Sequence, residues 1–256
     1  MGGGQKQLTS LYINKDGSNK ALNNVYANIN SSSKEIFSSG TPISQIAPGT
    51  IISFDTSLSG SMVSTDFIVL GPSQAKDTTL ILQKRVYEYK AWDARSNHVV
   101  YDGSDIDTYL SSTNSNSYRS KLSTKLLNAL VKTNIESFLV SSQSMSTLKR
   151  DIFLISYAEL GGTTTGSITS QLEGQSYLSA LCTAYNTTNS NTAREGEGDY
   201  TSPYWTRSAY NYYYVHIVDT SGEIDNTNYA NSNQTSIGSY SLYLRPILSI
   251  NSNYKI

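Results

Sequence analysis

The chain has 256 residues, only 15% of them charged, and its 19 Lys and Arg nearly balance 20 Asp and Glu. This length is enough to bury a substantial core in one large domain. The balanced charge gives no reason to expect nucleic acid, a membrane surface or a strongly charged substrate as a partner. Cys182 is the single cysteine, which excludes an intramolecular disulfide and argues against a cysteine-based zinc site.

The first ten residues are predicted to be a flexible leader. They lack the apolar run of a secretion signal, and no stretch of the sequence reaches the apolar length that is needed to cross a bilayer. We therefore expect neither export by the general secretion route nor insertion into a membrane.

Two similar short units follow the leader, at residues 11–22 and 25–36, and Tyr12 of the first matches Tyr26 of the second. Each unit consists of an apolar run, a turn and a second run, which is the pattern of a β-hairpin. One hairpin alone is marginally stable in water. We therefore expect residues 11–40 to form two hairpin repeats that pack on a neighbouring protein or on copies of themselves.

Residues 41–256 are predicted to form the main domain, which opens with β-rich runs. The runs at 48–54, 66–70 and 79–83 are rich in Ile, Val, Leu and Phe and are separated by Gly, Ser and Pro. This composition predicts antiparallel strands. A fourth buried strand is predicted at 151–156.

Two helices are predicted in the middle of the domain, over 104–110 and 121–131. Ser104 or Asp105 can cap the first helix, and apolar residues recur at helical spacing in both segments. A helical turn is expected at 157–160, where two glycines end it. Residues 183–200 are mostly Asn, Thr, Gly and Glu, so we expect an exposed loop there.

The residues that could carry chemistry do not form a catalytic or metal-binding pattern. His98 and His216 lie in no nucleophile motif, and both are expected at the surface or in an interface. The acidic residues of 195–199 lack the alternation of an EF-hand loop, so a solvated loop is favoured over a calcium site. No glycine motif for phosphate is present. We therefore expect no enzymatic activity, no metal and no cofactor.

The segment between Tyr204 and Tyr243 holds eight of the 20 tyrosines, interspersed with Asn, Ser and Thr. Tyrosine offers a rigid ring and a hydroxyl at low entropic cost, and this composition is typical of binding surfaces. An ordinary β-strand is the alternative interpretation. Because neighbouring strand residues face opposite sides, the three adjacent tyrosines at 212–214 cannot all point into the core. A display surface is therefore favoured.

A series of short stretches, taken in chain order, carries a resemblance to a known family. They are Asp66-Phe67-Ile68-Val69-Leu70, Trp92-Asp93, Ser104-Asp105-Ile106 with Tyr109-Leu110, Ile152-Phe153-Leu154-Ile155-Ser156-Tyr157-Ala158-Glu159, Trp205-Thr206-Arg207-Ser208, Gly222-Glu223-Ile224 and Leu244-Arg245-Pro246-Ile247. From about Ile43 to the end, the chain resembles the C-type-lectin-fold proteins of unnamed function from gut bacteria and their prophages. The resemblance implies an α+β fold, with a twisted antiparallel sheet and two flanking helices. The amino-terminal units resemble short repeats of phage structural proteins.

Some members of that family are targets of diversity-generating retroelements, which rewrite a carboxy-terminal variable repeat. The resemblance implies a variable segment at 204–246, in which Trp205, Arg207, Gly222, Arg245 and Pro246 are scaffold. A single, undiversified binding site with the same composition is the alternative. The candidate ligand-binding residues are Tyr210, Asn211, Tyr212, Tyr213, Tyr214, His216, Asn226, Asn228, Tyr229, Asn231 and Asn233.

The resemblance implies a noncatalytic receptor-binding protein of a phage or prophage tail, located on the virion or at a cell surface. Its expected partners are a host cell-surface protein or glycan and other virion or tail proteins, and a homotrimer would add multivalency. A structural virion subunit and a bacterial surface adhesin are the alternatives. The tripeptides of calcium-dependent lectins are absent, and Cys182 alone cannot supply the paired cysteines of formylglycine-generating oxidases. A glycan-cleaving enzyme would need paired carboxylates.

Overall fold

The computed structural model describes residues 11–15, 18–22, 24–29, 32–38, 40–95, 98–163, 173–195, 202–224, 229–231 and 241–256. The leader at 1–10 lies outside these ranges. In the described part of the chain, no helix has the length and apolar character required to span a membrane.

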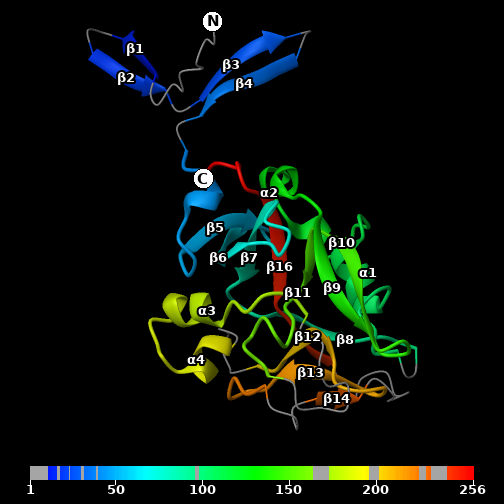
Figure 1. Cartoon of the computed structure of the whole chain (residues 1–256). Coiled ribbons are helices and arrows are strands. Elements are labelled where there is room, and N and C mark those ends of the chain that lie inside the picture. The colour runs from blue at the N-terminus through cyan, green and yellow to red at the C-terminus, as the bar shows by residue number, and fades with distance from the viewer. Residues whose placement is uncertain are drawn as a thin grey trace, which may run out of the picture.

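The amino-terminal residues form two separate two-stranded sheets (Figure 1). In the first sheet, Leu11 pairs with Leu22, and in the second, Asn24 pairs with Ser38, both in antiparallel register. The turns at 16–17 and 30–31 lie outside the described residues. The strands are β1 (Leu11–Lys15), β2 (Ser18–Leu22), β3 (Asn24–Ile29) and β4 (Ser32–Ser38).

The first sheet of the main domain is antiparallel and has the order β11-β16-β7-β6-β5. Every residue of its central strand β7 is buried, which fits the apolar and β-branched composition of that run. Figure 1 shows β16 passing down the middle of the domain. The strands are β5 (Ile51–Thr56), β6 (Val63–Pro72), β7 (Thr78–Gln83), β11 (Ile152–Leu154) and β16 (Pro246–Asn251).

A second five-stranded sheet lies below the first and has the order β14-β13-β12-β15-β8 (Figure 1). Its strands are antiparallel except β12 and β15, which run parallel where Tyr204 meets Tyr243. Only Arg245 separates β15 from β16, so one continuous segment joins both sheets. The strands are β8 (Tyr87–Ala91), β12 (Tyr204–Ala209), β13 (Tyr214–Val218), β14 (Tyr229–Asn231) and β15 (Ser241–Leu244).

Short helices and one hairpin surround the sheets. The predicted capping residue Ser104 accepts a hydrogen bond from the Asp107 amide at 3.1 Å. The second helix begins only after Ser123, later than predicted, because Leu122 still forms a β-bridge with Thr56. The elements are η1 (Ile43–Gln45), α1 (Asp105–Ser111), η2 (Arg119–Lys121), α2 (Thr124–Ala129), β9 (Thr133–Leu139), β10 (Ser144–Arg150), α3 (Leu178–Ala184) and α4 (Ser190–Arg194).

The exposed loop predicted at 183–200 is wrong in its first part. Helix α3 continues to Ala184, and α4 follows within the segment. Ala193 and Arg194 are buried, because the Arg194 guanidinium donates to the Gly222 carbonyl at 3.0 Å and its own carbonyl accepts from Tyr204. Polar composition alone did not reveal these long-range partners. Residues 196–200 lie outside the described chain.

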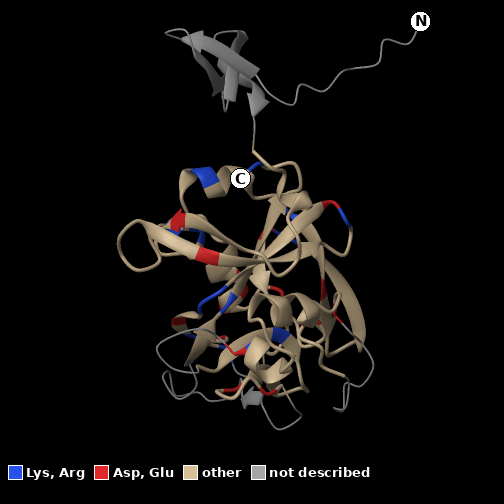
Figure 2. Cartoon of the chain, turned by 90° about the vertical axis from the view of Figure 1, so that its left-hand side faces the viewer, with Lys and Arg blue, Asp and Glu red and all other residues tan. Residues whose placement is uncertain are grey.

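The observed architecture is a mixed α+β domain with mostly antiparallel sheets and few helices. Its core is continuous across both sheets and includes the paired indoles of Trp92 and Trp205, with ring centroids 5.5 Å apart. The two ends of the domain are joined by backbone hydrogen bonds between Thr41 and Ile256. Residues of both charges are spread along the ribbon in Figure 2, and the sequence holds nearly equal numbers of the two. The single predicted sheet is wrong, since the main domain contains two five-stranded sheets.

A substitution at Gly222 tests the close contact between the turn after β13 and the backbone of α4. Its φ is +74°, and a Cβ atom there would lie 2.0 Å from the Asn191 carbonyl oxygen. Gly103 is a matched control, with a φ of +70° and open space around its Cβ position. We expect Gly103→Ala to lower the free energy of unfolding by about 1 kcal/mol and Gly222→Ala by about 3 kcal/mol, measured by urea denaturation. Equal losses would contradict the backbone contact.

Candidate ligand-binding face

The turn between β12 and β13 carries the three adjacent tyrosines. The Tyr210 amide donates to the Tyr214 carbonyl at 2.8 Å, which closes the turn. The Asn211 Oδ1 atom accepts from the amides of Tyr213 at 2.8 Å and Tyr214 at 3.0 Å. An Asn side chain that bonds to the backbone two and three residues later fixes a turn locally. These bonds fix the backbone of the turn. Asn211, which was predicted to contact a ligand, therefore also stabilises the turn itself.

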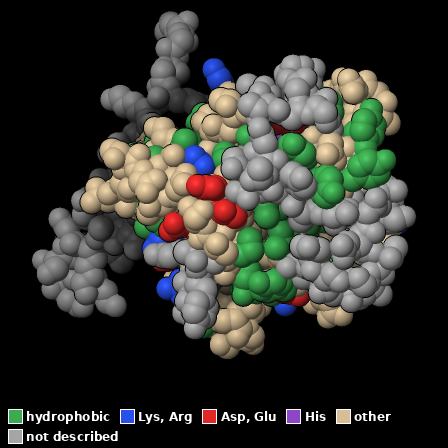
Figure 3. All heavy atoms as spheres, turned by 90° about the horizontal axis from the view of Figure 1, so that it is seen from below, with side chains coloured by type: hydrophobic (Ala, Val, Ile, Leu, Met, Phe, Trp, Pro, Cys, Tyr) green, Lys and Arg blue, Asp and Glu red, His purple; other side chains and the backbone are tan. Residues whose placement is uncertain are grey.

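Two of the tyrosines project from this turn into solvent. Tyr212 and Tyr213 are each 51% exposed, whereas Tyr210 and Tyr214 are half-buried. Two adjacent large aromatic side chains with this exposure make the turn a candidate contact surface. Figure 3, which views the molecule from below, shows hydrophobic side chains, a class that includes tyrosine, gathered on the lower face beside a small acidic group.

His216 lies beneath the turn instead of on the surface. Its ring stacks on Tyr157, with centroids 4.0 Å apart and 19° between the planes, and meets Tyr210 edge-on at 5.1 Å. Only 8% of the residue is exposed, and its Nδ1 has no hydrogen-bond partner among the residues that the structure describes. Burial lowers the pKa of His216 from 6.5 to about 4. The prediction of a surface histidine at this position is therefore wrong, because Tyr157, far away in sequence, covers the ring.

Arg207 anchors β12 behind the turn through a fully buried guanidinium. Its Nη1 and Nη2 donate to the two carboxylate oxygens of Glu159 at 2.7 and 2.9 Å. Nη1 also donates to the Leu154 carbonyl at 2.8 Å, and Nε donates to the Glu136 carbonyl at 3.0 Å. A bidentate pair with these further bonds compensates much of the cost of burying two charges. The resemblance implied a scaffold role for Arg207, and its geometry suits one.

Glu173 is a second buried carboxylate beside this ion pair. It accepts from the Phe138 amide at 2.6 Å and from the Ser208 hydroxyl, which in turn accepts from the Tyr157 amide at 2.9 Å. Burial raises the pKa of Glu173 from 4.5 to about 7, although Arg207 and the hydrogen bonds oppose the shift. One cation and two carboxylates thus share this interior. Glu173 links the covering segment around Tyr157 to the strand that carries the turn.

Arg245 is the other large buried cation, at the junction of the two sheets. It has no carboxylate partner among the described residues, and its guanidinium donates instead to the Gln83 and Arg194 carbonyls and to the Tyr185 and Tyr204 hydroxyls. These bonds satisfy the guanidinium with neutral acceptors. The other positions assigned to the scaffold, Trp205, Gly222 and Pro246, are also buried.

The remaining predicted contact residues are only partly described. Tyr229 and Asn231 belong to β14, where they pair with His216 and Tyr214. The turn and β14 therefore share one edge of the lower sheet. Asn226, Asn228 and Asn233 lie outside the described residues. Tyr204, which belongs to the tyrosine-rich segment, is fully buried.

Sequence reasoning missed one exposed aromatic pair. Tyr89 on β8 is 51% exposed and meets Tyr243 on β15, with ring centroids 4.0 Å apart. Tyr89 lies more than a hundred residues before the tyrosine-rich segment, so a composition window could not include it. Tyrosines alternate with charged residues in Tyr87-Glu88-Tyr89-Lys90, which is the pattern of a strand with one face in solvent. This pattern could have indicated Tyr89.

Within the described ranges, no group of three or more His, Cys, Asp or Glu side chains is placed to hold a metal ion. Glu195 follows α4, whereas Glu197 and Asp199, the other acidic residues of the predicted solvated loop, lie outside these ranges. The arrangement that stands out chemically is the braced turn with its two exposed phenol rings.

Comparison with known proteins places most of the chain in one family. A family model described as "Domain of unknown function (DUF6273)" matches residues 76–252, which is more than half of the chain. The match covers both sheets except β5 and β6. Comparisons with curated proteins and with solved structures found no match.

Glu173 and His216 are expected to change stability with pH in opposite directions. The folded pKa of Glu173 is raised to about 7, so its protonation stabilises the fold as pH falls from about 7 to 4.5. The folded pKa of His216 is lowered to about 4, so protonation favours the unfolded chain as pH falls from 6.5 to 4. Between pH 4.5 and 6.5 the two effects largely cancel in the native protein.

Single substitutions separate the two effects. Relative to the native protein, His216→Phe should gain free energy of unfolding as pH falls from 6.5 to 4.5, and Glu173→Gln should lose it, each by up to about 3 kcal/mol. Urea denaturation at a series of pH values measures both differences, and carboxylates common to all three proteins drop out of them. If the free energy of unfolding changed with pH in the same way for both variants, the opposite effects assigned to Glu173 and His216 would be wrong.

Proposed function

The chain belongs to the DUF6273 family, whose description assigns no activity, and we propose from its own geometry that it is a noncatalytic recognition protein. Its ligand-binding face is centred on the turn at 210–214 and extends along β14. The observation that carries this proposal is the exposure of Tyr212 and Tyr213 on a turn whose backbone is already fixed.

Rigidity of the turn matters because ordering a loop on binding costs free energy. The bonds to Asn211 and the closure between Tyr210 and Tyr214 have already restricted this backbone, so a partner meets rings in a fixed arrangement. Each phenol contributes a broad apolar ring and a hydroxyl, which suit a protein surface or a glycan equally. The buried layer of His216 and Tyr157 supports the turn from below.

The finer assignments also belong to this proposal. We assign a C-type-lectin-like fold, supported by the mixed α+β architecture and by helices α1 and α2 near their predicted places. The setting is a phage or prophage tail, with the protein on the virion or at a cell surface. The amino-terminal hairpins would join it to other tail proteins. A trimer would multiply weak affinities at each site.

Removal of the exposed rings tests the proposed face. We expect the double substitution Tyr212→Ala with Tyr213→Ala to reduce cell binding of the purified protein at least about tenfold, since two anchor rings are lost. Binding is measured by co-sedimentation with intact cells of the strain that encodes the protein and of related strains. Both side chains are 51% exposed, so the thermal midpoint should change by no more than a few degrees.

Tyr89→Ala is the matched control, because Tyr89 is equally exposed but lies on β8 at the other edge of the lower sheet. It should leave cell binding unchanged. A double variant that binds as well as the native protein, or a native protein that binds none of the cells, would refute the receptor role.

Diversification of the segment 204–246 is tested in the neighbouring DNA. We expect a near-copy of the codons for Trp205 to Pro246 that differs only at adenines, next to a reverse transcriptase gene. Sequencing of the locus measures this directly. A locus without such a copy would leave the binding face intact as a proposal and would overturn its hypervariability.

A further inference from the structure

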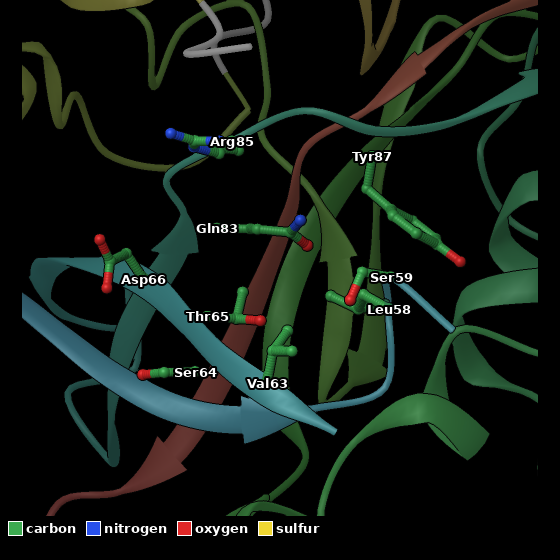
Figure 4. Close-up of a pocket in the computed structure, with 9 residues that line it drawn as sticks. All are labelled: Leu58, Ser59, Val63, Ser64, Thr65, Asp66, Gln83, Arg85 and Tyr87. Atoms are coloured by element: carbon green, nitrogen blue, oxygen red, sulfur yellow. The ribbon is translucent and has the colours of Figure 1, made fainter. Parts of the chain in front are cut away.

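A pocket of about 410 Å³ lies between the β5–β6 hairpin and the segment that follows β7 (Figure 4). Its lining comes from β6, from β7 and the segment after it, from the β5–β6 loop, and from Tyr87 at the start of β8, whereas the tyrosine turn joins β12 to β13. The volume lies within the range of small-molecule sites. From its lining we propose that this pocket binds a small organic acid, a molecule with one carboxylate and an apolar body.

The pocket contains side-chain hydrogen-bond donors that the described residues leave unused. Arg85 is exposed, and its side chain has no ion pair or hydrogen bond with the described residues. Gln83 is only 3% exposed, and its Oε1 accepts from the Tyr118 hydroxyl at 2.6 Å. This bond directs the amide nitrogen away from Tyr118, and Figure 4 shows the side chain reaching into the pocket. A guanidinium and an amide N–H together suit a carboxylate.

The opposite part of the pocket is apolar. Leu58 and Val63 come from the hairpin, and Val63 is 41% exposed although it is β-branched and apolar. Tyr87 supplies an aromatic ring. The Tyr118 ring packs edge-on against it, with centroids 5.8 Å apart, and the Lys121 Nζ atom lies 5.6 Å from the Tyr87 ring centroid. These walls would cover the hydrocarbon part of a ligand whose carboxylate faces Arg85. Burial of that part supplies affinity, and the charge supplies orientation.

Asp66 is the acidic residue of the lining, and its position leaves Arg85 available. Its carboxylate accepts from the Ser53 hydroxyl at 2.6 Å. Residues 63 and 65 face one side of β6, and residues 64 and 66 face the other. Figure 4 accordingly shows the Asp66 carboxylate directed away from Gln83 and Tyr87. No ion pair joins Asp66 to Arg85 among the described residues, so the Arg85 guanidinium keeps its donors.

The test uses phenylacetate and its neutral counterpart 2-phenylethanol as probes for the full-length protein. Amide chemical shifts in two-dimensional NMR spectra are followed during titration at low ionic strength. We expect phenylacetate to shift the amides of 58–66 and 83–87 saturably and to bind at least about tenfold more tightly than 2-phenylethanol. Arg85→Gln should remove that difference.

Lys132→Gln is the matched control, since it removes one exposed positive charge outside the pocket and should leave the titration unchanged. Equal binding of both probes would overturn the carboxylate class. The same holds if Arg85→Gln binds phenylacetate as the native protein does. It also holds if these amides show no saturable shift up to about 20 mM phenylacetate. None of these outcomes bears on the tyrosine face, which the cell-binding variants test separately.

Discussion

The ion pair between Arg207 and Glu159 is the interaction on which the assembly of the domain depends. Arg207 belongs to β12 of the lower sheet, yet its guanidinium also binds the carbonyls of Leu154 in β11 and Glu136 in β9. One side chain therefore joins both large sheets and the β9–β10 hairpin. Removal of either charge would leave the other buried and unpaired, at a typical cost of 3–5 kcal/mol. This strong constraint fixes the strand from which the tyrosine turn departs.

Arg245 provides a second fixed point by different chemistry. It joins β15 to β16 and is satisfied by two carbonyls and two tyrosine hydroxyls, so no carboxylate has to be buried with it. Among its acceptors is the Arg194 carbonyl at the end of α4, whose own side chain binds Gly222. The two arginines therefore hold β12 and β15, the parallel neighbours within the lower sheet. A rigid support of this kind lets an exposed turn keep its shape.

Local patterns predicted the elements whose causes are local. The β-rich runs became β5, β6 and β7, and Ser104 caps a helix where a capping residue was expected. The predictions failed where distant residues decide. The division of the strands into two sheets and the parallel pairing of Tyr204 with Tyr243 have no local signature. Likewise, Leu122 remains outside α2 because its partner is Thr56.

The tyrosine-rich segment shows the same division between composition and environment. Composition identified the segment, but burial then assigns each residue its role: Tyr204 lies in the core, His216 packs under Tyr157, and Tyr212 and Tyr213 remain in solvent. The exposed pair lies on a turn held by Asn211, and neither tyrosine belongs to a strand or to the buried ion pair. A position that tolerates substitution and still presents a fixed backbone is where a recognition protein can vary its specificity at least cost in stability.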